Sequence, residues 1–147
     1  MQNVNGFDID GVIHQGSFGA GIRPGPHDVI ITGRSHEESK ETLHFLRKNG
    51  INNVVFFNPV KFEDKTRKSS GTHKAKTINK LLEMGIKINL FFEDDEIQAA
   101  EIEKATSVTV VRVLSGHVEK ENVRALNTKD LAKYGSNRAG LVVCGGY

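Results

Sequence analysis

The chain has 147 residues, a formal net charge of +2, 37% hydrophobic and 26% charged residues, which fits one globular domain over residues 1–147 and argues against intrinsic disorder. No apolar run approaches the roughly 20 residues of a transmembrane helix, and the first residues lack the basic and apolar regions of a signal peptide. A single cysteine, Cys144, excludes an internal disulfide, so we expect a cytoplasmic location and no membrane partner.

Two strands and a glycine-rich connection are predicted for the first part of the chain. Apolar residues at positions 4–9 predict a short strand that ends in acidic residues. Residues 12–27 contain four glycines and two prolines, which predict a loop or hairpin. Residues 29–31 predict a buried strand, and residues 32–34 the turn after it.

A first helix is predicted to begin at Ser35. Ser35 and Glu38 fit a capping box, in which each side chain accepts a hydrogen bond from a free backbone N–H. Leu43 and Leu46 predict the buried face of the helix, and Gly50 predicts its end at the left-handed cap position.

A second helix is predicted to follow a strand at residues 54–57 and a lysine-rich loop at residues 58–71. Thr72 is expected to cap this helix and Gly85 to end it. Its apolar face is expected to hold Ala75, Ile78, Leu81 and Leu82.

The remaining elements continue the alternation. Residues 88–92 predict a strand, residues 94–105 a third helix and residues 108–114 a fifth strand. A helix at residues 119–133 and a strand at residues 141–144 would follow. That last strand would add an edge to the sheet or pair with a second copy of the chain in a homo-oligomer.

Alternating strands and helices predict an α/β fold. We expect a doubly wound, mainly parallel, Rossmann-like sheet of five strands with helices on both faces. Ligands of such sheets bind beyond the carboxyl ends of the strands. Polar residues follow three predicted strands, namely Asp8 and Asp10, Thr32, and residues 93–95, so we expect these side chains to meet at one edge.

Asp8 and Asp10 form the first of four polar motifs. Two carboxylates at a strand end suit a divalent metal ion, or a nucleophile beside a proton-transfer group. Asp-x-Asp-Gly also occurs in calcium-binding loops, but an EF-hand loop needs further acidic residues shortly after Gly11, and they are missing.

The other three motifs each allow two interpretations. Residues 32–34 place a hydroxyl and a glycine before a helix, which favours either an anion site or a routine turn. A lysine near the start of the second helix, Lys74 or Lys76, would either neutralise the charge of a ligand or only be solvated at the surface. Residues 93–95 are three adjacent carboxylates, which a bound cation would stabilise and which a helix N-terminus also favours.

In this order the four motifs, over residues 4–113, resemble those of the haloacid-dehalogenase-like (HAD) hydrolases. Residues 7–13 resemble the first HAD motif, residues 30–34 the second and residues 92–95 the fourth. For the third motif we favour Lys74, because Thr72 as the cap would place it in the first turn of the helix.

The resemblance implies a phosphatase that depends on Mg²⁺. Asp8 would attack phosphorus and form an aspartyl-phosphate, while Asp10 would protonate the leaving group and then activate water. The phosphoryl group would be bound by Thr32, Gly33, Arg34 and Lys74. Mg²⁺ would be held by Asp8, the carbonyl of Asp10, Asp94 and Asp95.

Two features differ from most HAD proteins. No helix is predicted within residues 12–27, and neither this interval nor the one before the motif lysine has room for a cap domain. We therefore expect a capless protein with an open site. The C-terminal segment, residues 115–147, would replace the missing helix on one face of the sheet.

The substrate class stays open between a phosphorylated small molecule and a phosphate-ended polyanion. The basic loop at residues 61–68, with Lys65, Arg67 and Lys68, favours a polyanion. Phe62 is the one aromatic residue among these lysines, fewer than a nucleic-acid platform uses.

The main alternative is an HAD-like protein that binds a phosphorylated ligand or a partner protein without turnover. A receiver domain is disfavoured because Asn58 and Pro59, and no aspartate, follow the third predicted strand. A P-loop nucleotidase is disfavoured because the chain lacks Gly-Lys-Ser/Thr before a helix.

Overall fold

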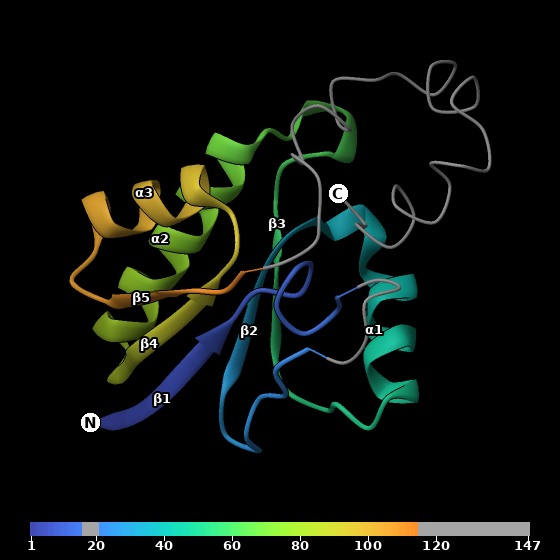
Figure 1. Cartoon of the computed structure of the whole chain (residues 1–147), viewed down its shortest axis with the longest axis horizontal. Helices are drawn as coiled ribbons and strands as arrows, with labels where there is room; N and C mark the ends of the chain where they lie inside the picture. Colours follow the sequence, from blue (N-terminus) through green and yellow to red (C-terminus); the bar gives the residue numbers. More distant parts are fainter. Residues whose placement is uncertain (16–20, 115–147) are drawn as a thin grey trace.

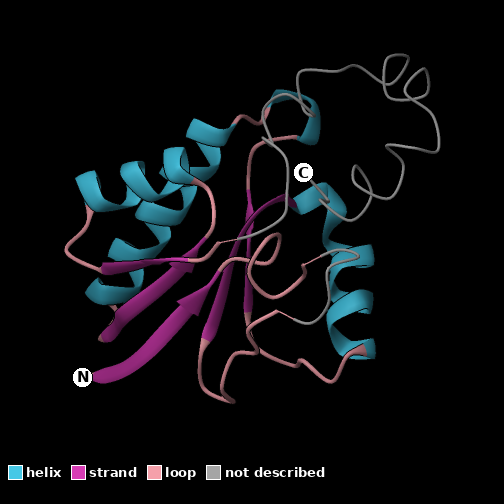
Figure 2. Cartoon of the chain, viewed as in Figure 1, coloured by secondary structure: helices cyan, strands magenta, loops and turns pink. Residues whose placement is uncertain are grey.

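The protein forms a parallel five-stranded sheet between two layers of helices (Figures 1 and 2). The computed structural model describes residues 1–15 and 21–114. The strand order is β3-β2-β1-β4-β5, and neighbouring strands are parallel, which confirms the predicted α/β fold. The strands are β1 (Gln2–Phe7), β2 (Val29–Ser35), β3 (Val55–Asn58), β4 (Ile86–Glu93) and β5 (Thr109–Arg112), and the α-helices are α1 (Ser39–Lys48), α2 (Arg67–Glu83) and α3 (Glu96–Ala105).

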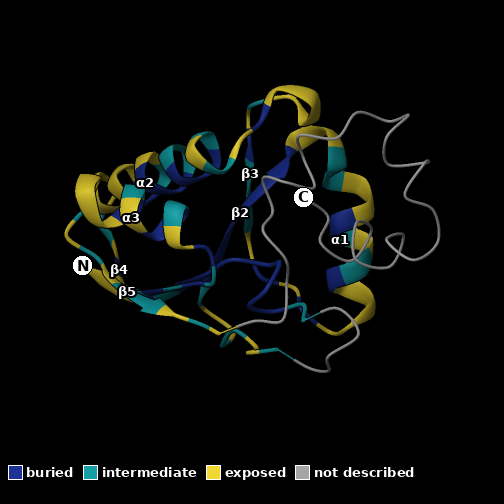
Figure 3. Ribbon diagram, turned by 45° about the horizontal axis from the view of Figure 1, so that its top comes forward, coloured by how far each residue is buried: buried dark blue, intermediate teal, exposed yellow. Residues whose placement is uncertain are grey.

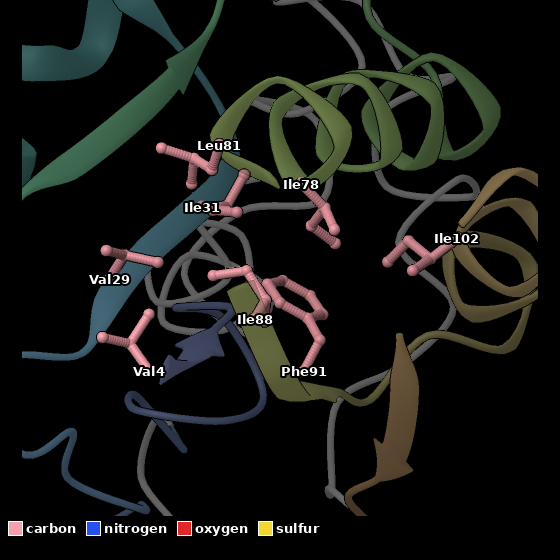
Figure 4. Packing of buried hydrophobic residues seen from close by; sticks show 8 residues of the cluster. All are labelled: Val4, Val29, Ile31, Ile78, Leu81, Ile88, Phe91 and Ile102. Atoms are coloured by element: carbon pink, nitrogen blue, oxygen red, sulfur yellow. The ribbon is translucent and has the colours of Figure 1, made fainter. Parts of the chain in front are cut away.

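Each face of the sheet has its own apolar core, because successive side chains of a strand point to opposite faces. In β2, Ile30 packs toward α1, whereas Ile31 packs toward α2. Figure 4 shows Ile78 and Leu81 of α2 packed against Ile31 and Phe91 of the sheet. Burying one such side chain stabilises the fold by about 1.5–3 kcal/mol. Strand β2 is buried along its whole length, whereas β5 has no buried residue, and the outer faces of the helices are exposed (Figure 3).

The face toward α1 is covered partly by the loop that follows β1. Ile9, Val12 and Ile13 of this loop are buried in one cluster with Leu46 of α1. The described residues between β1 and β2 contain no helix, as predicted, and the loop itself supplies the packing on this face. The C-terminal segment, which we expected in that role, lies outside the described residues together with its predicted helix and strand.

Strand β2 runs on to Ser35, so the predicted turn at residues 32–34 is wrong. All seven residues of β2 are buried, and Ser35 pairs with Asn58 of β3, so the neighbouring strand extends β2 beyond its glycine. The capping box of Ser35 and Glu38 is present, but it caps a 3-10 turn, His36–Glu38, that precedes α1.

Helix α2 begins at Arg67, so the predicted start at Thr72 is wrong. The N-cap is Thr66, whose hydroxyl accepts from the N–H of Ser69 (3.0 Å), while the Ser69 hydroxyl accepts from the N–H of Thr66 (2.8 Å). This reciprocal pair satisfies two free backbone donors, as a Ser/Thr–Glu capping box does.

Gly71 lies inside α2, although a glycine among polar residues suggested a loop. Helix α3 approaches this point so closely that a Cβ at Gly71 would lie 2.8 Å from the Cβ of Glu101. Leu82, expected on the apolar face of α2, is 38% exposed. Gly50 and Gly85 adopt positive φ after α1 and α2, as predicted for helix ends. None of the helices in the described ranges is long and apolar enough to cross a membrane.

Candidate functional site

The carboxyl ends of β1 and β4 hold the acidic residues predicted for the site. These strands are neighbours, while β2 and β3 lie on the other side of β1. The strand order therefore reverses here, and α/β sheets bind ligands in the crevice outside such a point. Asp8 follows β1 and its N–H donates to the carbonyl of Phe92 (3.1 Å). Glu93 ends β4, so the two carboxylates start from adjacent strands.

Lys74 reaches this edge from α2 and contacts both carboxylates. Its Nζ lies 3.1 Å from Asp8 Oδ1 and 2.6 Å from Glu93 Oε1, and it donates to Gln98 Oε1 of α3 at 2.6 Å. Lys74 is 0% exposed. A buried ammonium group is tolerated when it is paired and hydrogen-bonded, because an unpaired buried charge costs several kcal/mol. The contacts of Lys74 therefore join α2, the sheet and α3.

The two candidate lysines lie on different faces of α2. Lys74 faces Asp8, whereas Lys76 is exposed and lines a separate pocket, because two positions differ by about 200° around a helix. Lys74 does not lie in the first turn of the helix, where it was predicted. Since α2 begins at Arg67, Lys74 lies about two turns inside it.

Three carboxylates gather beside Lys74. One oxygen each from Asp8, Glu93 and Asp94 lie within 4.8 Å of one another. Gly11 has a φ of +85° and lies so close to Asp94 that a Cβ there would clash with the carboxylate. Glu93 Oε2 accepts hydrogen bonds from the N–H groups of Asp94 (3.1 Å) and Asp95 (3.2 Å). An all-oxygen set has the donor chemistry that hard divalent cations use, although acidic clusters also occur without a metal.

Asp95, predicted as a metal ligand, is engaged elsewhere. It is the N-cap of α3 and accepts from the N–H of Ile97 (2.9 Å). Arg67 of α2 donates to both of its oxygens at 3.0 Å, and Gln98 donates to Oδ2 at 3.1 Å. The Asp95 carboxylate therefore ties the beginning of α2 to the beginning of α3.

Asp10 and Arg34 form a buried ion pair. Arg34 donates from Nε to Asp10 Oδ2 (3.0 Å) and from Nη2 to Asp10 Oδ1 (2.8 Å), and its Nη1 donates to Thr42 Oγ1 (3.1 Å). Burial alone would lower the pKa of Arg34, but the charge and hydrogen bonds of Asp10 outweigh it and raise that pKa above its usual value. The structure thus pairs a predicted substrate ligand with the predicted proton-transfer group.

Thr32 and Gly33 lie beside this pair in β2. The Thr32 hydroxyl accepts from the N–H of Arg34 (3.0 Å) and is fully buried. The carbonyl of Gly33 accepts from Lys65 Nζ (3.3 Å). A Cβ at Gly33 would lie 2.8 Å from Ser70 Oγ, so this glycine allows α2 to approach the strand closely.

The basic loop is largely built into the fold. Lys65 is 4% exposed, and its Nζ lies 2.9 Å from Glu38 Oε2. Arg67 pairs with Asp95. Lys68 remains exposed. Neutralising all three cations together, as a test of polyanion binding, would therefore disturb the fold as well.

The sequence interpretation missed the contributions of Glu93, Gln98 and Arg67. Glu93 was one of three consecutive acids, and only the end of β4 places it inside, against Lys74. The signal that could have found it is the position of β4, since a strand ending one residue later carries Glu93 into the buried layer. No local sequence pattern indicated the roles of Gln98 and Arg67, because their contacts join two helices that are distant in the sequence.

No protein-family model matches the chain, and no curated protein matches it. The assignment of chemistry therefore depends on the geometry of the site and on the resemblance of its four motifs.

Proposed function

We propose that the protein is a Mg²⁺-dependent phosphohydrolase of the HAD type, in which Asp8 is the nucleophile. The observation that carries this proposal is the contact of Asp8 with Lys74 at 3.1 Å, at a reversal of strand order and beside Glu93 and Asp94. A carboxylate attacking a phosphate needs nearby positive charge, because nucleophile and substrate are both anions.

The reaction has two steps, and in each step one bond to phosphorus forms and another breaks. An Asp8 oxygen forms a bond to phosphorus, the bond to the leaving oxygen breaks, and that oxygen takes up a proton. A water then forms a bond to phosphorus, the aspartyl–phosphorus bond breaks, and inorganic phosphate leaves. Lys74 stabilises the charge that gathers between Asp8 and the phosphoryl group in both steps.

The donor set beside Lys74 fits a hard cation. Mg²⁺ would be held by Asp8, Asp94 and the backbone carbonyl of Asp10, and when bound it would neutralise the phosphoryl oxygens. Asp95 suits this role less, because both of its oxygens accept hydrogen bonds from Arg67.

The proton transfers are assigned to Asp10, with Arg34 as its positioning residue. In the structure both oxygens of Asp10 accept from Arg34, which orients the carboxylate while each oxygen keeps a lone pair for a proton. Since Asp10 would act in the chemical step, Arg34→Lys, which cannot reproduce the two-point contact, should change kcat more than KM.

Asp8→Asn tests the nucleophile. We expect the variant to keep the fold and to lose hydrolysis of p-nitrophenyl phosphate in the presence of Mg²⁺, because the amide cannot attack phosphorus. If a phosphorylated form can be trapped with the wild-type protein but not with Asp8→Asn, the phosphoryl group of the intermediate is on Asp8. Lys80→Ala, at an exposed position of α2, is the control. Wild-type rates in Asp8→Asn would refute the mechanism.

Mg²⁺ affinity tests the division of roles between the acids. Asp94→Asn should weaken Mg²⁺ binding more than Asp10→Asn, because the Asp10 ligand is its backbone carbonyl and survives the change. Calorimetric titration with MgCl₂ measures both variants. A larger loss in Asp10→Asn would contradict this set of ligands.

A second candidate function is binding of a phosphorylated ligand without turnover. The observation that favours it is again the Asp10–Arg34 pair, which occupies both oxygens of the predicted proton-transfer group. Phosphate binding that requires Mg²⁺, with neither hydrolysis nor a trapped intermediate in the wild type, would select this function over the first.

A further inference from the structure

A pocket lies beside α2, and its lining includes Lys76 but not Lys74. Its volume is about 480 Å³, within the range of roughly 300–1,000 Å³ that small-molecule sites occupy. Asn58, Pro59 and Val60, which end β3 and follow it, form one wall, and α2 contributes Lys68 and Lys76 to the other. We call it the β3–α2 pocket.

The lysines of this pocket carry charge that the fold does not use. Lys68 and Lys76 are exposed, and no acidic side chain of residues 1–15 or 21–114 forms a salt bridge with either. The neighbouring cations Lys65, Arg67 and Lys74 all pair with carboxylates. A phosphate entering the pocket therefore meets two cations without displacing an acidic side chain of the described part of the chain.

Spacing along the helix sets the shape of a matching ligand. Lys68 and Lys76 are eight residues apart, or about 12 Å at 1.5 Å per residue, and their flexible side chains can both bend toward a ligand. The wall opposite them holds the apolar surfaces of Pro59 and Val60. A ligand with an uncharged centre and a phosphate on each side complements this arrangement.

His73, which also lines the pocket, adds no charge to it. Burial lowers the pKa of His73 to about 4, and the positive charge of Lys74 adds to the effect. His73 therefore lines the pocket as a neutral residue at pH 7, and Thr72 and Asn58 add hydrogen-bonding groups. Such a surface suits a nucleoside better than a second anionic group.

Asn58 connects the pocket with the proposed active site. Its Nδ2 donates to the carbonyl of Gly33 (3.3 Å), next to Thr32, and lies 3.5 Å from Ser70 Oγ. Helix α2 forms a wall of both sites, with Lys74 toward Asp8 and Lys76 toward the pocket. A chain of linked nucleotides is a ligand whose units could occupy both.

We propose that the β3–α2 pocket binds one nucleotide unit of a single nucleic-acid strand. The phosphates on its two sides contact Lys68 and Lys76, and the nucleoside lies against Pro59, Val60 and His73. This binding does not depend on turnover at Asp8, and it makes a phosphate-ended strand the substrate class of the proposed hydrolase.

The test measures binding of adenosine 3′,5′-bisphosphate, which carries a phosphate on each side of one nucleoside, to the full chain with Asp8→Asn. Calorimetry should show saturable binding to one site. Lys68→Ala and Lys76→Ala should each weaken it about fivefold, and together by more than about tenfold. Adenosine, which has no phosphate, and inorganic phosphate, which has no nucleoside, should each bind at least about tenfold more weakly.

The matched control is Lys80→Ala, which removes an exposed charge from α2 outside the pocket and should leave the affinity unchanged. An equal loss from Lys80→Ala would reveal nonspecific attraction and overturn the proposal. Undiminished affinity in the double variant, or inorganic phosphate binding as tightly as the bisphosphate, would overturn it as well. Hydrolysis by the wild type is scored separately, so loss of the proposed enzyme activity and loss of pocket binding remain distinguishable.

Discussion

The two faces of α2 each carry a lysine, and the two lysines lie in opposite environments. On the face toward the sheet, Lys74 is fully buried and its Nζ contacts Asp8, Glu93 and Gln98. On the outer face, Lys76 is exposed and lines the β3–α2 pocket. The buried lysine is held by its partners, which keep its charge beside Asp8. The exposed lysine leaves its charge available to a ligand.

Removing the buried cation should have the largest effect. Lys74→Ala leaves Asp8 and Glu93 buried without their cation, so we expect the free energy of unfolding to fall by about 3–5 kcal/mol. Lys76→Ala should change it by less than about 0.5 kcal/mol. Urea denaturation measures both. Lys74→Met, which restores packing volume without charge, should remain destabilised, and full stability in this variant would show that the ion pairs do not hold the site together.

His73, next to Lys74 in α2, should make the free energy of unfolding depend on pH. The pKa of His73 is about 4 in the folded protein because of burial and the charge of Lys74, against 6.5 in an unfolded chain. Between these values the unfolded chain binds the proton and the folded chain does not, so the free energy of unfolding falls as the pH drops from 6.5 to 4. The loss is at most about 3 kcal/mol.

Thermal denaturation across this range isolates the contribution of His73. In His73→Gln, whose amide can still donate to the carbonyl of Phe56 as the ring nitrogen is placed to do, the dependence on pH should become shallower than in the wild type. His36→Gln, at an exposed position, is the matched control. An unchanged slope in His73→Gln would mean that other groups account for the loss of stability at low pH.

A substitution at the contact between α2 and α3 should have a smaller effect on the free energy of unfolding. Gly71→Ala places a Cβ 2.8 Å from the Cβ of Glu101 and 3.0 Å from the Cα of Gln98, and such overpacking costs about 1–3 kcal/mol. Alanine favours a helix over glycine by about 1 kcal/mol, so we expect a net loss of about 1 kcal/mol. A more stable Gly71→Ala variant would mean that α3 can shift away, and with it Gln98 and its contact with Lys74.

The order of elements could be read from the chain because it depends on local patterns. Apolar runs placed all five strands, and Gly50 and Gly85 marked the ends of α1 and α2. Parallel strands bring their carboxyl ends to one edge, so the proximity of Asp8 to the acids after β4 followed from this order. These predictions needed only periodicity, turn residues and the rules of parallel sheets.

The predicted element boundaries were wrong where contacts between distant segments outweigh local preferences. Gly71 suggested a loop, but packing of α3 against α2 keeps it helical. Residues 32–34 suggested a turn, but pairing of Ser35 with Asn58 extends β2. In each case a contact far along the chain outweighed a local preference, which is worth only about 1 kcal/mol per residue.

The sequence by itself determined the class of fold and the residues that could form a site: Asp8, Asp10, Thr32, a lysine of α2 and the acids at the end of β4. Only the tertiary structure decided their partners. It placed Glu93 beside Lys74, engaged Asp95 with Arg67, and left Lys68 exposed. The reason is electrostatic, because a buried charge requires a partner of opposite charge, and which partner is within reach depends on how α2 and α3 cross the sheet edge.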